Sequence, residues 1–113
     1  MNISLLEKFC DNNDIAVTTF QKAAEMLNDP DFITMGLAYK GVAIYTPKGN
    51  HKSIVYDESM SEEEKYFTFA HEIAHHALEH MTGRTNKRDA AEIEADVFAS
   101  ILMALSVFME MTV

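Results

Sequence analysis

The chain has 113 residues, of which 48% are hydrophobic and 24% are charged, and these proportions exclude collagen-like and wholly disordered proteins. The length suits one compact unit, so we predict a single domain over residues 1–113. Acidic residues outnumber basic ones by 18 to 9, and the net charge of −9 argues against direct nucleic-acid binding, because phosphates favour basic surfaces.

Other features indicate a cytoplasmic protein. The one cysteine, Cys10, excludes an internal disulfide and is expected to be a small buried side chain. The N-terminus lacks the basic and then apolar pattern of a secretory signal. The uncharged stretch from Val97 to Met109 is shorter than the roughly 18 residues that suggest a membrane span. We therefore predict a buried helix there and no membrane association.

The N-terminal part of the chain shows helical and strand-like patterns in turn. Apolar residues have helical spacing from Ile3 to Cys10, and the turn formers at 12–14 follow them. A short strand is predicted from Ile15 to Val17. A helix should then run from Phe20 to Leu27, and residues 28–31 break it.

A β-hairpin is predicted in the middle of the chain. Leu37 to Tyr45 and Ser53 to Tyr56 are rich in apolar and β-branched residues. The segment between them, Thr46 to Asn50, is dense in turn-forming residues.

Two long helices are predicted in the C-terminal half. Ser61 and Glu64 have the spacing of a capping box, so one helix should cover about 62–81, with Gly83 placed to end it. The second should run over about 88–105. The fold class is therefore α+β, a small N-terminal sheet or hairpin followed by two long helices.

The first of these helices carries an H-E-x-x-H motif, formed by His71, Glu72 and His75. Residues four apart lie on one helical face, so both imidazoles can reach one metal ion. Zinc is the expected ion, because neutral imidazole is one of its usual ligands. Glu72 lies one step round the helix, where it can take a proton from water near the metal without binding the metal itself.

A catalytic zinc site needs a third protein ligand. One branch of the zincins has a third histidine six residues after the second, with a glycine between, but these positions are Met81 and Leu78 here. His76 and His80 are poorly placed to be ligands, and we expect them to be solvated or to cap a helix end.

Acidic residues on the second long helix offer the missing ligand. Glu92 and Asp96 are four apart and share a face, so Glu92 could bind zinc while Asp96 accepts a hydrogen bond from a ligand histidine. Glu94 is the rival ligand, on another face of the helix. Alternatively, Asp89 and Glu92 could form an N-terminal cap, with the acids on a solvated face.

Together, these motifs resemble the ImmA/IrrE family of zinc metallopeptidases, whose pattern is F-T-x-A-H-E-x-x-H followed by E-x-E-A-(D/N)-x-F-A. Residues 67–75 and 92–99 carry the resemblance, and residues 41–56 resemble the small sheet of the family. The resemblance covers about residues 1–108, and it departs from the family at Ala104, where a proline is usual.

The resemblance implies a gluzincin-like site in which His71, His75 and Glu92 are zinc ligands and Glu72 is the catalytic acid/base. It also implies limited proteolysis of a partner protein, often a helix-turn-helix repressor of a mobile element or stress response. Oxyanion stabilisation needs a further donor. The candidates are Tyr39, Tyr45, Tyr56, His80 and Arg84.

A second hypothesis is a catalytically weak or inactive protein of the same fold that binds and sequesters a regulatory partner. Glu72 favours the enzyme, because a pure binder has no chemical need of it. The methionines at 103, 109 and 111 suit an adaptable interface, although ordinary core filling is the more common role of such side chains.

Overall fold

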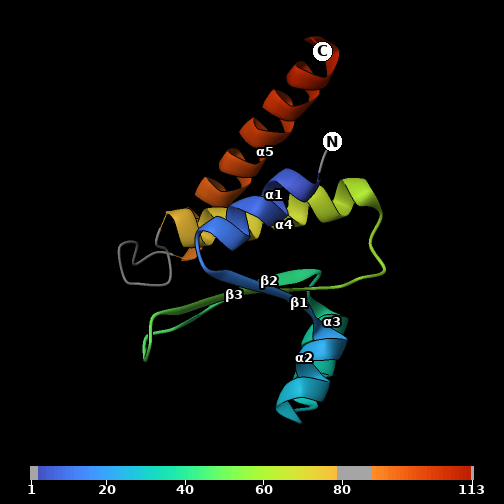
Figure 1. Ribbon diagram of the computed structural model, residues 1–113, viewed down its shortest axis with the longest axis vertical. Helices are drawn as coiled ribbons and strands as arrows, with labels where there is room; N and C mark the ends of the chain where they lie inside the picture. The colour runs from blue at the N-terminus through green and yellow to red at the C-terminus, as the bar shows by residue number, and fades with distance from the viewer. Residues whose placement is uncertain (1–2, 79–87, 113) are drawn as a thin grey trace.

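The computed structural model describes residues 3–78 and 88–112, with side chains for residues 3–78 and 90–105. Within these ranges, five helices surround a three-stranded sheet, as Figure 1 shows, and the predicted α+β class is confirmed. In chain order, the elements are α1 (Ile3–Asn12), β1 (Ile15–Thr19), α2 (Phe20–Leu27), α3 (Asp31–Ala38), β2 (Gly41–Thr46), β3 (His51–Tyr56), α4 (Glu62–Ala77) and α5 (Arg88–Thr112).

The sheet has the strand order β1-β3-β2, so β2 lies at an edge. β2 and β3 form the predicted antiparallel hairpin, with Gly41 opposite Tyr56 and Thr46 opposite His51. The turn between them uses Gly49 and Asn50 at positive φ, which these two residue types tolerate best. β1 pairs with β3 in parallel, and α2, α3 and β2 connect the two strands.

The helix α3 was not predicted, and the assignment of Leu37 and Ala38 to a strand is wrong. Both residues belong to α3, and the strand begins only at Gly41. The helix begins directly after Pro30, and the Asp29 carboxylate accepts a hydrogen bond from the Asp31 amide at 3.0 Å. A short apolar run is compatible with a helix or a strand, so its periodicity alone does not choose between them.

The helix α4 begins as the capping box predicts, because the Ser61 hydroxyl accepts a hydrogen bond from the Glu64 amide at 3.3 Å. It ends at Ala77, earlier than expected, where the Leu78 amide still donates to the Ala74 carbonyl but the Leu78 backbone leaves the helical region. The predicted end at about Met81, with Gly83 to end the helix, lies outside the described residues.

Two apolar clusters lie on opposite faces of the sheet. Neighbouring residues of a strand point to opposite faces, so Ile54 joins one cluster and Val55 the other. The larger cluster packs α1, α4 and α5 against the sheet, and the smaller one packs α2 and α3 (Figure 1). Cys10 belongs to the larger cluster and is fully buried, as expected, and burial raises the pKa of its thiol to about 11.

The helix α5 packs on α4, and its buried residues among those described are the alanines Ala91, Ala95 and Ala99. The prediction of a buried helix over 97–109 is only half right. A stripe with four-residue spacing, Ile93, Val97, Ile101 and Leu105, is more than half exposed. The partly buried Met103 packs against the core, whereas the side chains of Met109 and Met111 lie outside the described residues.

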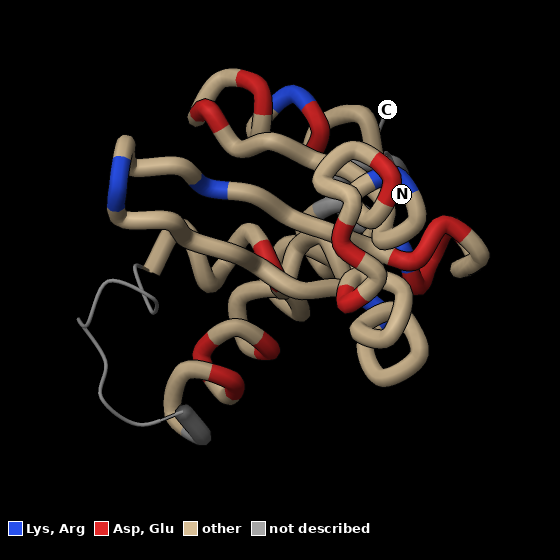
Figure 2. Tube along the Cα trace, turned by 90° about the horizontal axis from the view of Figure 1, so that it is seen from below, with Lys and Arg blue, Asp and Glu red and all other residues tan. Residues whose placement is uncertain are grey.

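None of the helices in the described ranges has the length and apolar content needed to cross a membrane. Acidic positions lie on several sides of the trace (Figure 2), in keeping with the net charge of −9.

Candidate metal centre

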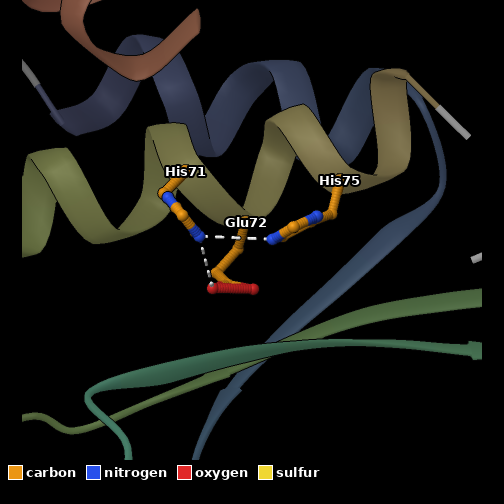
Figure 3. Close-up of side chains that lie close together, drawn as sticks. All are labelled: His71, Glu72 and His75. Atoms are coloured by element: carbon orange, nitrogen blue, oxygen red, sulfur yellow. Dashed lines mark hydrogen bonds and ion pairs between the residues drawn. The ribbon is translucent and has the colours of Figure 1, made fainter. Parts of the chain in front are cut away.

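The helix α4 holds His71 and His75 on one face, and their Nε2 atoms lie 3.2 Å apart (Figure 3). The four-residue spacing stacks the two side chains one turn apart, so both rings point out from the same side of the helix. Both rings are largely withdrawn from solvent, with side chains 16% and 11% exposed. Two imidazole nitrogens are thus directed at one point.

A carboxylate from α5 reaches the same point. Glu92 Oε2 lies 3.0 Å from His71 Nε2, and Glu92 Oε1 lies 3.2 Å from His75 Nε2. The close approach of α5 is possible because Ala95 and Ala99, which are fully buried, lie on the face that packs toward α4. The structure therefore brings the carboxylate of Glu92 to the histidines, although its side chain is still half exposed.

The side chain of Asp96 lies one turn beyond Glu92, and its Oδ1 atom is 2.9 Å from His71 Nδ1. Glu94 is only partly exposed, and it is not among the residues that line the cavity around the histidines. The alternative cap residue, Asp89, has no described side chain. Of the acids on α5 whose side chains are described, Glu92 and Asp96 are thus the two at the histidines.

The three residues have the spacing that a metal ion requires. Ligands at 2.0–2.1 Å from a tetrahedral zinc are separated by about 3.3 Å, and here the two Nε2 atoms lie 3.2 Å apart, while one Glu92 oxygen lies 3.0 Å from His71 and the other lies 3.2 Å from His75. When His71 donates its Nδ1 hydrogen to Asp96, its Nε2 lone pair faces the carboxylate of Glu92. Converging lone pairs repel unless a cation lies among them, so these residues fit a zinc ion.

Glu72 lies beside this group and is only 7% exposed. Its Oε1 atom is 3.9 Å from His71 Nε2, too long for a hydrogen bond. Burial raises the pKa of Glu72 to about 7, and the Glu92 carboxylate adds to the rise, while His71 and a backbone hydrogen bond from Ala43 oppose it. The geometry thus offers a carboxyl group with a near-neutral pKa next to the possible metal position.

These residues open into a cavity of about 910 Å³. The edge strand β2 forms one wall, from Gly41 to Ile44, and the C-terminal part of α3 continues that wall. Glu92 and Asp96 of α5 also line the cavity. A second cavity of about 500 Å³ shares Lys40, Phe67 and Thr68 with the first, so the hollow extends along α4 toward its N-terminus.

Gly41 and Ala43 contribute to the site and were not singled out from the sequence. A Cβ atom on Gly41 would lie 2.5 Å from Thr68 Cγ2, so only glycine allows β2 to approach α4 this closely. This approach brings the Ala43 amide to Glu72. The only sequence signal is a glycine within a predicted strand, and such a glycine marks a bulge or a bend as often as a close contact.

The expectation that His76 is solvated or caps a helix end is wrong. His76 is 4% exposed, and its Nε2 donates a hydrogen bond to the Ser53 carbonyl of β3 at 2.8 Å. It lies about 100° round α4 from His75, a rotation that points it at the sheet rather than the cavity. Burial lowers the pKa of His76, which favours the neutral ring. His80 lies outside the described residues.

The candidates for oxyanion stabilisation differ in whether they line the cavity. Tyr39 lines the cavity and is half exposed. Tyr45 and Tyr56 are not among the described residues that line it, and the ring of Tyr56 packs edge-on against Phe69. Arg84, like His80, lies outside the described part of the chain.

Comparison with known proteins identifies the family. The family model of the peptidase M78, IrrE N-terminal-like domain matches residues 11–110, a stretch that includes both motif segments, every element from β1 to α4 and most of α5. A search of curated proteins and a search of solved structures each give no significant match. The family model suggests a metallopeptidase-like function, and because it covers most of the chain, the protein belongs to the ImmA/IrrE family.

Proposed function

We propose that the protein is a zinc-dependent endopeptidase that makes limited cuts in a partner protein. The observation that carries this proposal is the convergence of two imidazoles and one carboxylate within 3.0–3.2 Å of one another, beside a buried second carboxyl group. Family membership supports the reaction class, because the family is one of peptidases.

In this proposal His71 and His75 hold the zinc through Nε2, and the Glu92 carboxylate is the third protein ligand. Zinc, when bound, supplies Lewis acidity that polarises a peptide carbonyl and makes water more acidic. Asp96 accepts the Nδ1 hydrogen of His71, which fixes the tautomer that leaves Nε2 free to bind metal.

Glu72 is the acid/base. In the metal-free protein burial raises the pKa of its carboxyl group to about 7, and a buried carboxyl group at this position can take up and give away a proton. Its carboxylate can accept a proton from the attacking water and deliver it to the amine that leaves. The hydrogen bond from the Ala43 amide holds the side chain in place for this transfer.

The substrate is proposed to be a polypeptide because of the strand beside the site. The cavity wall from Gly41 to Ile44 belongs to an edge strand, and an edge strand can pair with an extended peptide through its backbone. The finer proposal, that the partner is a helix-turn-helix repressor, rests on the family resemblance of the two motifs.

Cleavage of a peptide library tests this function. Zinc-loaded wild-type protein and Glu72→Gln protein of equal zinc content are incubated with peptides from a digested proteome, and new termini are identified by mass spectrometry. We expect new termini with the wild-type protein alone, because the amide cannot accept the proton. No new termini from wild type, or equal numbers from both proteins, would contradict the proposal. Sequestration of a partner would then be the better account.

A further inference from the structure

The second cavity, of about 500 Å³, lies beside the candidate metal centre and has no part in the proposed chemistry. It is lined by the N-terminal half of α4, by Lys40 from the loop before β2 and by Met103 of α5. Lys40, Phe67 and Thr68 line the metal cavity as well, so the two cavities adjoin. We call the second cavity the α4 pocket. A chain bound in the metal cavity could therefore place a side chain in the α4 pocket.

The α4 pocket uses the same helix faces as the candidate metal centre. Phe67 precedes His71 by one helical turn, and their ring centroids lie 6.3 Å apart. Met103 follows Asp96 by about two turns, so both side chains lie on one side of α5 and line adjoining cavities. One strip along α4 and α5 thus carries the metal residues at one end and the α4 pocket at the other.

The buried side of the α4 pocket is apolar, and its exposed side is charged. Phe67 and Met103 are partly buried and pack against the larger apolar cluster, which holds them in place. Lys40, Glu63 and Glu64 are exposed. Lys40 and Glu64 form an ion pair and so neutralise each other. The charge of Glu63 is left over, and it would repel an acidic side chain.

The hydroxyl groups of the lining are already paired within the protein. The Ser61 hydroxyl accepts a hydrogen bond from the Glu64 amide at 3.3 Å, and the Thr68 hydroxyl donates to Met60 Sδ at 3.5 Å. A polar side chain would lose hydrogen bonds to water in the α4 pocket without equivalent partners there. An apolar side chain would gain free energy by covering Phe67 and Met103. The lining therefore favours a large apolar side chain.

The distance from the metal residues indicates which residue of a bound peptide would reach the α4 pocket. Phe67 lies about 6 Å from His71 along the helix axis, a distance that about two residues of an extended peptide span. The edge strand gives a similar spacing. The Ala43 amide donates to Glu72, and Lys40, three residues earlier in the chain, lines the α4 pocket.

We propose that the α4 pocket binds a large apolar side chain of the protein substrate, two or three residues from the bond that is cut, and that Met103 selects this side chain. That the bound chain is a substrate rests on the proposed function, whereas binding of an apolar side chain beside the metal does not. Met103 lines the α4 pocket and not the metal cavity, so it can be changed without replacing a metal residue. Such a pocket discriminates between proteins by one side chain.

Peptides that carry a zinc-binding end test this proposal without any need for cleavage. A hydroxamate group binds zinc through its two oxygen atoms and so holds one end of a short peptide at the metal. One series has the hydroxamate at the C-terminal end and the other has it at the N-terminal end, which covers both directions along β2. Each series carries leucine, phenylalanine, serine, glutamate or lysine two or three residues from the hydroxamate, with alanine elsewhere. Calorimetric titration of the zinc-loaded protein gives the affinities.

We expect the leucine and phenylalanine peptides of one series to bind about fivefold or more tightly than the serine peptide, and the glutamate peptide to bind most weakly. Met103→Gln should reduce the preference for leucine over serine to less than about twofold, because it puts a polar group of similar length in the lining, whereas Met103→Leu should retain the preference. Met26→Gln is the matched control and should change nothing. Met26 is 78% exposed and is not among the described residues that line either cavity. Circular dichroism checks that each variant keeps its helices.

Three results would overturn the proposal: no preference for leucine and phenylalanine over serine in either series, tightest binding of the lysine peptides, or equal loss of preference in Met103→Gln and Met26→Gln. The first two need no variant, so they hold even if Met103→Gln does not fold.

Failure of the proposed function looks different. If the peptides bind with the expected preference but wild-type protein produces no new termini in the library, the α4 pocket remains a side-chain site and the peptidase proposal fails. New termini with no apolar residue two or three positions away would instead refute the role of the α4 pocket and leave the peptidase proposal standing.

Discussion

The helices α4 and α3 border the same cavity, but they differ in the kind of side chain that they bury. α4 buries Glu72, His75 and His76, all of which are costly to remove from water, whereas α3 is apolar and buries no residue. Each of these side chains has a polar neighbour, because Glu72 accepts a hydrogen bond from the Ala43 amide, His75 faces Glu92, and His76 donates to the Ser53 carbonyl. The apolar side chains of α3 divide between the small cluster, where Phe32 and Met35 pack, and the surface, where Ile33 and Leu37 are exposed. The buried polar groups thus lie on the helix that carries the candidate metal centre.

The largest expected effect on the α4 side is loss of the third ligand. Glu92→Ala should weaken zinc binding by more than about 100-fold, because the carboxylate that faces both imidazoles is removed. Competition with a chromophoric chelator measures this affinity. Glu94→Ala is the control from the same helix and should bind zinc like the wild type. Equal losses of zinc affinity in the two variants would show that Glu92 contributes no more to zinc binding than Glu94 does.

Removal of the acid behind His71 should have a smaller effect. Asp96→Ala should weaken zinc binding by about 10–100-fold, the usual result when a residue that orients a ligand imidazole is lost. The same chelator competition reports it. Asp96→Asn should recover part of the affinity, because the amide oxygen can still accept the Nδ1 hydrogen of His71. If Asp96→Ala binds zinc as tightly as wild type, the orienting role is wrong.

The close contact between β2 and α4 predicts a loss of stability that can be repaired. Gly41→Ala should lower the free energy of unfolding by about 1–3 kcal/mol, since the new methyl group meets Thr68 Cγ2. Thr68→Ser removes that methyl group and should restore much of the loss in the double variant. Urea denaturation followed by circular dichroism gives both values. If the two single changes in the free energy of unfolding simply add in the double variant, residues 41 and 68 do not interact, and the contact is contradicted.

The smallest effect concerns the start of α4. Ser61→Ala should lower the free energy of unfolding by about 1 kcal/mol, because the hydroxyl that accepts the Glu64 amide hydrogen is lost. Ser61→Asp should retain most of the stability, since aspartate is also a favourable N-cap residue. Thermal unfolding measures the difference. No change with alanine would mean that the cap adds nothing to the folded helix.

Features that depend on short stretches of sequence were predictable. The Ser61 cap, the turn at Gly49 and the four-residue spacing of His71 and His75 are all local. The missed features depend on distant contacts. The burial of His76 needs the Ser53 carbonyl of another element, and the role of Gly41 needs Thr68. The exposed stripe of α5 was missed for the same reason, because an apolar run does not reveal how much of it a neighbour covers.

The central claim is that Glu92, and not Glu72, completes the metal site. A crystal structure of zinc-loaded protein, with the ion located by its anomalous scattering, tests this most directly. The account predicts one zinc about 2.0–2.2 Å from His71 Nε2, His75 Nε2 and a Glu92 oxygen, with Glu72 outside bonding distance. The three residues His71, Glu72 and His75 also lie close enough together to hold an ion among themselves. A zinc bound by Glu72 in place of Glu92, or no zinc at these histidines, would contradict the claim.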